Sequence, residues 1–269
     1  MEAWAASSMT PSDLEQSLPP TTSDVFLGDR LTIRQPLKGY RAGVDAVLLA
    51  ASVHPNGPQG ATLLDIGAGV GTVGLCAAAR LTQLSAVLLE REPVLAHLAQ
   101  SNAQANGLTA RVRAVTASVT SSAPELSSLG LEPDSFDCCV ANPPFHDEEA
   151  GTAAGDALKA ASHAMPSTGL EDWARFMARM VRPAGRATLI HKAEALTRIL
   201  AVMAPRFGSL VVFPIFPRAG ESAIRVIVEG IKGSRAPLEF RQGLVLHEDG
   251  HGFTPRATAI LRHGAALEI

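Results

Sequence analysis

The sequence predicts an α/β fold, a mostly parallel sheet with helices on both faces, in which the last two strands form an antiparallel hairpin. Short β-type runs alternate with helical stretches from Ala61 onward, which is typical of parallel strands joined by helices. A glycine-rich segment follows the first of these strands. Only residues 217–222 separate the last two β-type runs, and this connection is too short for a parallel crossover.

The N-terminal part precedes this alternation. Residues 1–23 show no sustained period and are rich in Ser, Thr and Pro, so we expect a flexible lead-in to a single domain over residues 24–269. Gly28 and Asp29 separate two short apolar pieces, which indicates a hairpin within residues 25–33. The apolar residues 45–53 predict a helix that ends at a His-Pro-Asn-Gly turn. The hairpin and this helix occupy residues 24–60, and the sheet with its C-terminal elements occupies residues 61–269.

The alternating part is assigned element by element from the sequence. Short runs rich in apolar and β-prone residues are assigned to strands, and the longer stretches between them to helices. The expected strands are residues 62–66, 86–90, 112–116, 136–141, 186–191, 210–216 and 223–229. The expected helices are residues 72–81, 93–106, 171–181 and 193–203.

Composition narrows the class of protein. Of the 269 residues, 46% are hydrophobic and 18% are charged, which allows one large globular domain and excludes a wholly disordered chain. The apolar runs are too short to cross a bilayer, and the N-terminus lacks a basic region followed by an apolar run, so we expect a soluble, cytoplasmic protein. Cys76, Cys138 and Cys139 lie in apolar sequence, and we expect reduced thiols in the core.

The charges are divided unevenly along the chain. Residues 1–150 hold eight Lys and Arg against sixteen Asp and Glu, whereas residues 151–269 hold fifteen against ten. A basic half can bind a polyanion through a local patch, although an unevenly charged, solvated surface explains the same counts. Basic residues of the last third would supply phosphate contacts if they share a face with the cleft. These residues are Arg218, Arg225, Lys232, Arg235 and Arg241.

The most informative segment is residues 63–72, LLDIGAGVGT, an apolar strand that runs into a glycine-rich turn and then a helix. Glycines let a ligand approach the backbone, and the start of a helix offers free N–H groups. Glu90, at the end of the next strand, is placed to accept hydrogen bonds from ribose hydroxyls. Residues 69–74 also match the dinucleotide fingerprint G-x-G-x-x-G, so an NAD-dependent oxidoreductase is one interpretation.

Asp65 favours S-adenosylmethionine over a dinucleotide. It opens the pattern D-x-G-x-G-x-G, completed by Gly67, Gly69 and Gly71, which is typical of class I methyltransferases. A carboxylate at this position would hold the methionine amino group of S-adenosylmethionine, whereas it would repel a pyrophosphate. We therefore expect these four residues and Glu90 to bind S-adenosylmethionine.

The sequence Asn142-Pro143-Pro144-Phe145 follows the fourth strand and resembles the catalytic signature of methyltransferases that modify a planar amino or amide nitrogen. Such a nitrogen is conjugated and therefore a weak nucleophile. Asn142 Oδ1 and the Pro143 carbonyl can each accept one amino hydrogen, the two prolines hold the backbone so that these acceptors converge, and Phe145 can stack on a base. The alternative is an ordinary turn after a strand.

With these motifs the chain resembles the bacterial tRNA (adenine-N6)-methyltransferases that act on position 37 of valine tRNA. The resemblance covers about residues 24–265 and includes residues 40–46, the glycine turn, residues 142–145 and residues 216–220. It implies a Rossmann-like class I fold with a seven-stranded sheet, S-adenosylmethionine as the cofactor and methyl transfer to a tRNA adenine. The same N-P-P-[FY] signature occurs in enzymes that methylate rRNA guanine N2, DNA adenine or a glutamine amide of release factors. A non-catalytic RNA-binding module is a further alternative.

The resemblance adds further candidate residues. The family commonly has an aspartate after the third strand that contacts the adenine amino group of the cofactor, and Ser118 occupies that place here. We also expect Ser118 and Asn142 to contact the cofactor. Expected substrate contacts are Tyr40, which lies in the matching residues 40–46, and the basic residues Arg218 and Arg241. His163 follows the Asn142 loop and is a further expected substrate contact, with a structural role as the alternative.

Two histidines and two acidic residues gather in residues 247–251, but the interleaved glycines indicate a turn more than a metal site. We therefore expect no metal, and the chemistry expected of residues 142–145 requires none. The expected partner is RNA, in the first place tRNA. The sequence does not determine the oligomeric state, and we favour a monomer.

Overall fold

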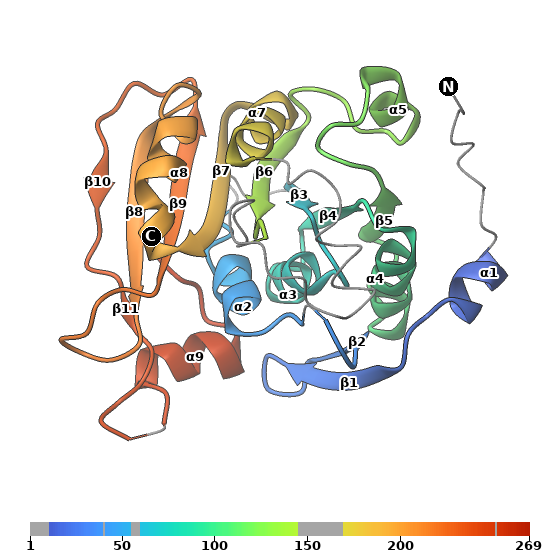
Figure 1. Ribbon diagram of the computed structural model, residues 1–269, viewed down its shortest axis with the longest axis horizontal. Coiled ribbons are helices and arrows are strands. Elements are labelled where there is room, and N and C mark those ends of the chain that lie inside the picture. Colours follow the sequence, from blue (N-terminus) through green and yellow to red (C-terminus); the bar gives the residue numbers. More distant parts are fainter. Residues whose placement is uncertain (1–10, 40, 55–59, 145–168, 251) are drawn as a thin grey trace, which may run out of the picture.

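The computed structural model describes residues 11–39, 41–54, 60–144, 169–250 and 252–269. Across these residues a nine-stranded sheet has the order β10-β8-β9-β7-β6-β3-β4-β5, with β11 beside β8 (Figure 1). Its longer strands are β3 (Thr62–Ile66), β4 (Ser85–Glu90), β5 (Val112–Thr116), β6 (Phe136–Ala141), β7 (Val181–Lys192), β8 (Phe207–Phe216) and β9 (Arg225–Lys232). The two-residue strands β10 (Glu239–Phe240) and β11 (Leu244–Val245) extend the sheet at β8.

Strands β3 to β7 are parallel, and β9 pairs antiparallel with both β7 and β8. The chain passes from β3 outward to β4 and β5, and then returns to place β6 on the other side of β3. This reversal creates a switch point between β3 and β6, which is where α/β sheets bind ligands. We call the side where β3 to β8 end and β9 begins the carboxyl edge. The predicted mostly parallel sheet with an antiparallel hairpin is thus confirmed.

Helices cover both faces of the sheet, and each face has its own apolar core (Figure 1). One face carries α2 (Val44–Ala51), α3 (Thr72–Arg80), α4 (Pro93–Ala105) and α9 (Pro255–His263). The other face carries α5 (Ala123–Ser128), α7 (Leu170–Met180) and α8 (Leu196–Met203), which follows a 3-10 turn at Ala193–Ala195. Side chains alternate between the faces, so the neighbours Cys138 and Cys139 belong to different cores. All three cysteines are free and buried, as predicted.

The N-terminal region requires a correction. Residues 1–23 were predicted to be a flexible lead-in, but residues 11–23 contain helix α1 (Pro11–Gln16) and the first half of β1 (Thr21–Phe26), which pairs antiparallel with β2 (Leu31–Pro36). Helix α1 is tied to α4 by a contact of 2.9 Å between Glu15 Oε2 and His97 Nε2. Such contacts join segments far apart in the sequence, so local composition does not reveal them. Residues 1–10 lie outside the described ranges.

The elements predicted between residues 62 and 229 all occur; β3, β5 and β6 have the predicted bounds, and the others differ at one or both ends by one to a few residues. The largest displacement is at β7, which begins at Val181 because an irregularity in its pairing with β6 lets it start early. The β8–β9 hairpin is not the last structure of the chain, since β10, β11 and α9 follow it. No helix in the described part of the chain is long and apolar enough to cross a membrane.

Candidate active site

The glycine turn, residues 67–71, continues from β3 at the carboxyl edge and leads into α3. Gly67 and Gly69 have φ angles of 67° and 56°, in the left-handed region that favours glycine. A Cβ on Gly67 would lie 2.5 Å from the ring of Trp173, whereas a Cβ on Gly69 would meet nothing within 4 Å. The turn is therefore closed by an indole at Gly67 and open beside Gly69, where a ligand can approach the backbone.

Trp173 is a residue of this region that sequence patterns did not identify. It lies on α7 and is 7% exposed. The sequence predicted the helix but contains no signal that links this side chain to a turn about one hundred residues earlier. Packing of α7 on the sheet face beside β6 and β7 brings the two together.

Two buried carboxylates adjoin the glycine turn. Asp65 is 1% exposed, and its Oδ2 accepts a hydrogen bond of 2.9 Å from the Gly74 N–H in the first turn of α3. Glu90 is 7% exposed and accepts hydrogen bonds from the Gly69 N–H at 2.8 Å and from the Glu92 N–H at 3.0 Å. Burial raises the pKa of Asp65 to about 7, against the effect of the bond from Gly74, and the charge of Glu90 adds to the rise. Burial also raises the pKa of Glu90.

This pair of carboxylates fits the cofactor that the sequence predicts. A cation beside the turn would stabilise both groups in their ionised form, whereas a phosphate would be repelled. S-adenosylmethionine carries a sulfonium and an ammonium group, and its ribose hydroxyls can donate to carboxylates. In this structure the Asp65 side chain is turned toward α3, so its direct contact with the methionine amino group stays a prediction.

Asn142 emerges beside the glycine turn. Ile66 at the end of β3 pairs with Ala141 at the end of β6, so Asn142 and Gly67 follow directly from paired residues. Adjacent strands lie about 4.8 Å apart, which makes the two residues neighbours at the switch point. Asn142 is half-buried, and of the two prolines that follow it the first is buried and the second exposed. Phe145 lies outside the described residues.

Ser118 lies at the carboxyl edge, one strand beyond Glu90. The preceding residue, Ala117, donates its N–H to the Glu90 carbonyl at 3.0 Å. The Ser118 hydroxyl lies 3.0 Å from the Thr120 hydroxyl, and the Ser118 N–H donates to the Ser121 hydroxyl at 3.1 Å. The structure thus places Ser118 at the same edge of the sheet as Glu90, and the Ser118 hydroxyl is directed into its own loop.

The four predicted substrate contacts do not all reach this edge. Tyr40 and His163 lie outside the described residues. Arg218 follows the end of β8 at the carboxyl edge, and its guanidinium is 3.9 Å from the Glu221 carboxylate. The Arg241 N–H donates to the carbonyl of Val212, four positions before the end of β8, so its backbone lies about 13 Å from the carboxyl edge.

The other basic residues of the last third also separate. Arg225 begins β9 at the carboxyl edge and pairs with Asp45 of α2 at 2.8 Å. Residues 232–235 lie at the opposite end of β9. Of the five basic residues considered from the sequence, Arg218 and Arg225 therefore share the edge with Asn142. Sequence order alone did not distinguish them from the rest.

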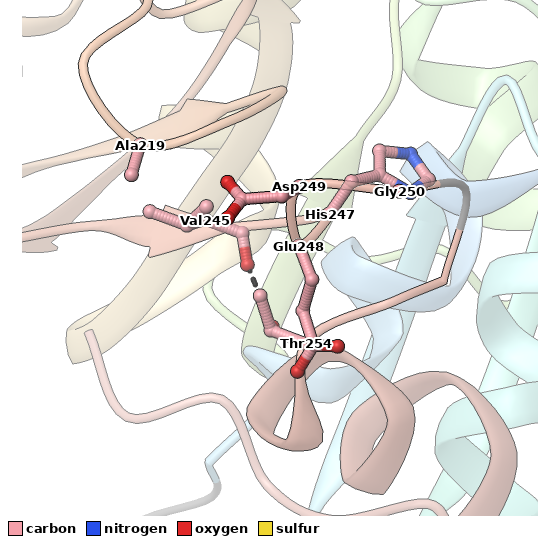
Figure 2. A pocket seen from close by; sticks show the side chains of 7 residues that line it. All are labelled: Ala219, Val245, His247, Glu248, Asp249, Gly250 and Thr254. Atoms are coloured by element: carbon pink, nitrogen blue, oxygen red, sulfur yellow. Dashed lines mark hydrogen bonds between the residues drawn. The ribbon is translucent and has the colours of Figure 1, made fainter.

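A pocket of about 620 Å³ opens beyond β8 and β11 (Figure 2). Figure 2 shows the Thr254 hydroxyl, which donates to the Val245 carbonyl at 2.8 Å, beneath the segment 247–250. This segment forms the turn that the sequence predicted, since the Glu248 N–H donates to the Gly252 carbonyl at 3.1 Å. Among the described residues, no three His, Cys, Asp or Glu side chains are grouped so that they could hold a metal ion. Strands β7 and β9 separate this pocket from Asn142.

Comparison with known proteins connects this geometry to an enzyme class. The family model of the methyltransferase small domain matches residues 43–170. A tRNA1(Val) (adenine(37)-N6)-methyltransferase of Porphyromonas gingivalis is 30% identical over 176 residues, which are 65% of this chain and 67% of that protein.

Two solved structures extend the comparison. A protein of Agrobacterium tumefaciens, described as a predicted O-methyltransferase, is 32% identical with a TM-score of 0.69, over 83% of this chain and 98% of that chain. The 16S rRNA N2 methyltransferase of T. thermophilus, solved with AdoMet and guanosine, is 19% identical with a TM-score of 0.51. That match covers 81% of this chain and 46% of that chain, and at this identity it shows likeness of fold alone.

Proposed function

Because the chain belongs to the tRNA1(Val) (adenine(37)-N6)-methyltransferase family, we propose that it transfers a methyl group from S-adenosylmethionine to the N6 amino nitrogen of adenine 37 in valine tRNA. The observation that carries the proposal is the position of Asn142 beside the glycine turn at the switch point. A methyl donor held at the turn and an amino group held by Asn142 would be neighbours. A tRNA substrate implies the cytoplasm as the place of action.

The residues around the turn are suited to hold the cofactor. When bound, S-adenosylmethionine supplies an electrophilic methyl group on its sulfonium. Glu90 lies at the end of β4, where its carboxylate can accept from ribose hydroxyls, and Asp65 contributes negative charge beside the turn. The backbone at Gly69 is open to a ligand. Ser118 lies beyond Glu90, after the end of β5, where the adenine ring of the cofactor would lie.

Asn142 and Pro143 would act on the amino group that receives the methyl. The adenine amino nitrogen is conjugated with its ring, so its lone pair is only weakly nucleophilic. Two acceptors, Asn142 Oδ1 and the Pro143 carbonyl, would hold the two amino hydrogens and direct the lone pair toward the methyl group. After transfer the methylated nitrogen would be positively charged and strongly acidic, and it would lose one of its two hydrogens to water.

An RNA substrate is supported by the carboxyl edge beyond Asn142. Arg225 and Arg218 lie along this edge in the direction of β8, whereas the buried carboxylates lie in the direction of β4. Phosphates of an anticodon loop would contact the basic side while a flipped base enters toward Asn142. Extrusion costs little for an unpaired loop base, and Phe145 would offer it a stacking surface.

O-methylation is a second candidate, because the Agrobacterium relative is described as a predicted O-methyltransferase. A hydroxyl acceptor has one proton and needs a single base, whereas the Asn-Pro pair offers two converging acceptors. The residue types at 142 and 143 therefore favour an amino group.

The test is methylation of purified RNA and protein with labelled S-adenosylmethionine, followed by mass spectrometry of the nucleosides. The tRNA substrate is purified from a strain that lacks the enzyme. We expect labelled N6-methyladenosine to form in its valine tRNA. Labelled guanosine in rRNA, a labelled release factor or a ribose methyl would contradict the proposal. Asn142→Ala should lower kcat by about a hundredfold or more and leave cofactor affinity near that of the wild type. An unchanged single-turnover rate would mean that residues 142–145 form only a structural turn.

A further inference from the structure

The side chain of Asn102, on α4, is 1% exposed and is hydrogen-bonded at both polar atoms. Its Oδ1 accepts from the Arg34 N–H at 2.9 Å. Its Nδ2 donates to the Arg34 carbonyl at 3.0 Å and to the Val70 carbonyl at 3.0 Å. Arg34 belongs to β2 and Val70 to the glycine turn, so one amide joins the N-terminal hairpin to the turn.

Asn106, one helical turn later, bonds to β2 in the same way. Its Oδ1 accepts from the Thr32 N–H at 2.9 Å and its Nδ2 donates to the Thr32 carbonyl at 2.7 Å. Four residues of a helix rise about 6 Å and two residues of a strand about 6.6 Å, which explains why the two spacings match. Asn106 Nδ2 also donates to the Asn102 carbonyl at 2.8 Å, and within the described residues the Asn106 side chain makes no hydrogen bond to the glycine turn.

The bond from Asn102 fixes a peptide group of the turn. The Val70 carbonyl is held by Asn102, and the N–H of the same peptide, from Gly71, donates to the Ala68 carbonyl at 2.8 Å. Gly71 has a φ of 88°, and a glycine restricts peptide rotation less than any other residue. Without Asn102 the Val70 carbonyl would lose this partner, and the peptide would be freer to rotate.

We propose that Asn102 is a positioning residue for the cofactor, because it braces the glycine turn against the N-terminal hairpin. The inference rests on the proposed function in one respect, that the turn binds S-adenosylmethionine. The hairpin precedes residue 43, where the match to the methyltransferase small domain begins, whereas Asn102 and Val70 lie within the match, so the brace joins the matched region to an element outside it. A turn held in its binding conformation binds its ligand more tightly, because it loses less conformational entropy on binding.

Asn102→Ala and Asn106→Ala form a matched pair for the test. Each variant removes two bonds to the backbone of β2, but only Asn102→Ala also removes the bond to Val70. We expect both to lower stability in urea, and only Asn102→Ala to weaken S-adenosylmethionine binding, by about tenfold in calorimetry, the scale of one unsatisfied buried carbonyl. The KM for S-adenosylmethionine should rise by a similar factor, with kcat at saturating cofactor near the wild-type value.

Hydrogen exchange in the wild-type protein tests the same link without a substitution. Binding of the demethylated cofactor should slow exchange of the Arg34 amide, which bonds to Asn102, more than exchange of the Thr32 amide, which bonds to Asn106. This measurement decides the matter if Asn102→Ala does not fold. Unchanged exchange at Arg34 in the saturated complex would overturn the inference.

The outcomes separate the inference from the proposed function. If the wild-type protein binds neither S-adenosylmethionine nor its demethylated product, the cofactor site and the inference both fail. If the wild type binds and the two alanine variants bind equally well, the inference alone is overturned and the proposed function stands.

Discussion

Replacing Asp65 with asparagine is expected to stabilise the protein above pH 7 and to weaken cofactor binding. The Asp65 carboxyl is buried, and its pKa is raised from 3.8 to about 7. The folded state therefore holds a proton on Asp65 that the unfolded state releases between these two pH values. Because the folded state binds more protons there, the contribution of Asp65 to the free energy of unfolding falls as the pH rises from about 4 to about 7. Above pH 7 this contribution no longer changes.

The magnitude follows from the shift. One pKa unit corresponds to about 1.4 kcal/mol, so a shift from 3.8 to about 7 corresponds to at most about 4 kcal/mol. Asparagine is uncharged at every pH and its Oδ1 can still accept from the Gly74 N–H. Asp65→Asn should thus gain stability over the wild type progressively from pH 4 to pH 7. It should also lose about tenfold or more in S-adenosylmethionine affinity, because a charge beside the cofactor is removed.

The assay is urea unfolding of both proteins at pH 5 and pH 8, with calorimetric titration of the cofactor at pH 8. Asp137→Asn is a control with the opposite sign. Burial raises the pKa of Asp137, but hydrogen bonds from Thr62 and Arg182 lower it overall, so this carboxylate stabilises the protein above its unfolded pKa. Asp137→Asn should lose stability at pH 8 and keep cofactor affinity. A loss of stability at pH 8 for Asp65→Asn would refute the reasoning from burial, and unchanged cofactor affinity would remove Asp65 from the cofactor site.

Three further predictions follow from the same geometry. Gly67→Ala would place a Cβ 2.5 Å from the Trp173 ring, so we expect about 1 to 3 kcal/mol lower stability in urea. We also expect tenfold or more weaker cofactor binding. A cofactor affinity equal to that of the wild type would contradict the assignment of the glycine turn to the cofactor site. Arg218→Ala should weaken tRNA binding several-fold in filter binding and Arg241→Ala much less, and equal effects would argue against the carboxyl edge as the RNA surface. The tRNA affinity should fall steeply between low and physiological salt while the affinity for the cofactor changes little, and a flat profile would speak against phosphate contacts.

The local elements and the chemistry of the motifs can be predicted from the sequence without knowledge of the fold. Strands β3, β5 and β6 have the predicted bounds, because short apolar runs between glycine and polar turns specify a buried strand regardless of its partners. Helices α5 and α9 were not predicted, although their sequences carry local signals. Ser122 and Glu125 form a capping box at α5, and Thr254 caps α9 before Pro255.

Which of these elements contact one another depends on how the whole chain folds. Asn142 and Gly67 are far apart in the sequence, and only the return of β6 to the side of β3 makes them neighbours. The same holds for Trp173 against Gly67 and for Asn102 against Val70, where each partner lies on another element. The spacing of apolar residues indicates the type of one element and which of its faces is buried, because both depend on the side chains of that element. The partner across the fold depends on how all the elements pack, and no single segment encodes it.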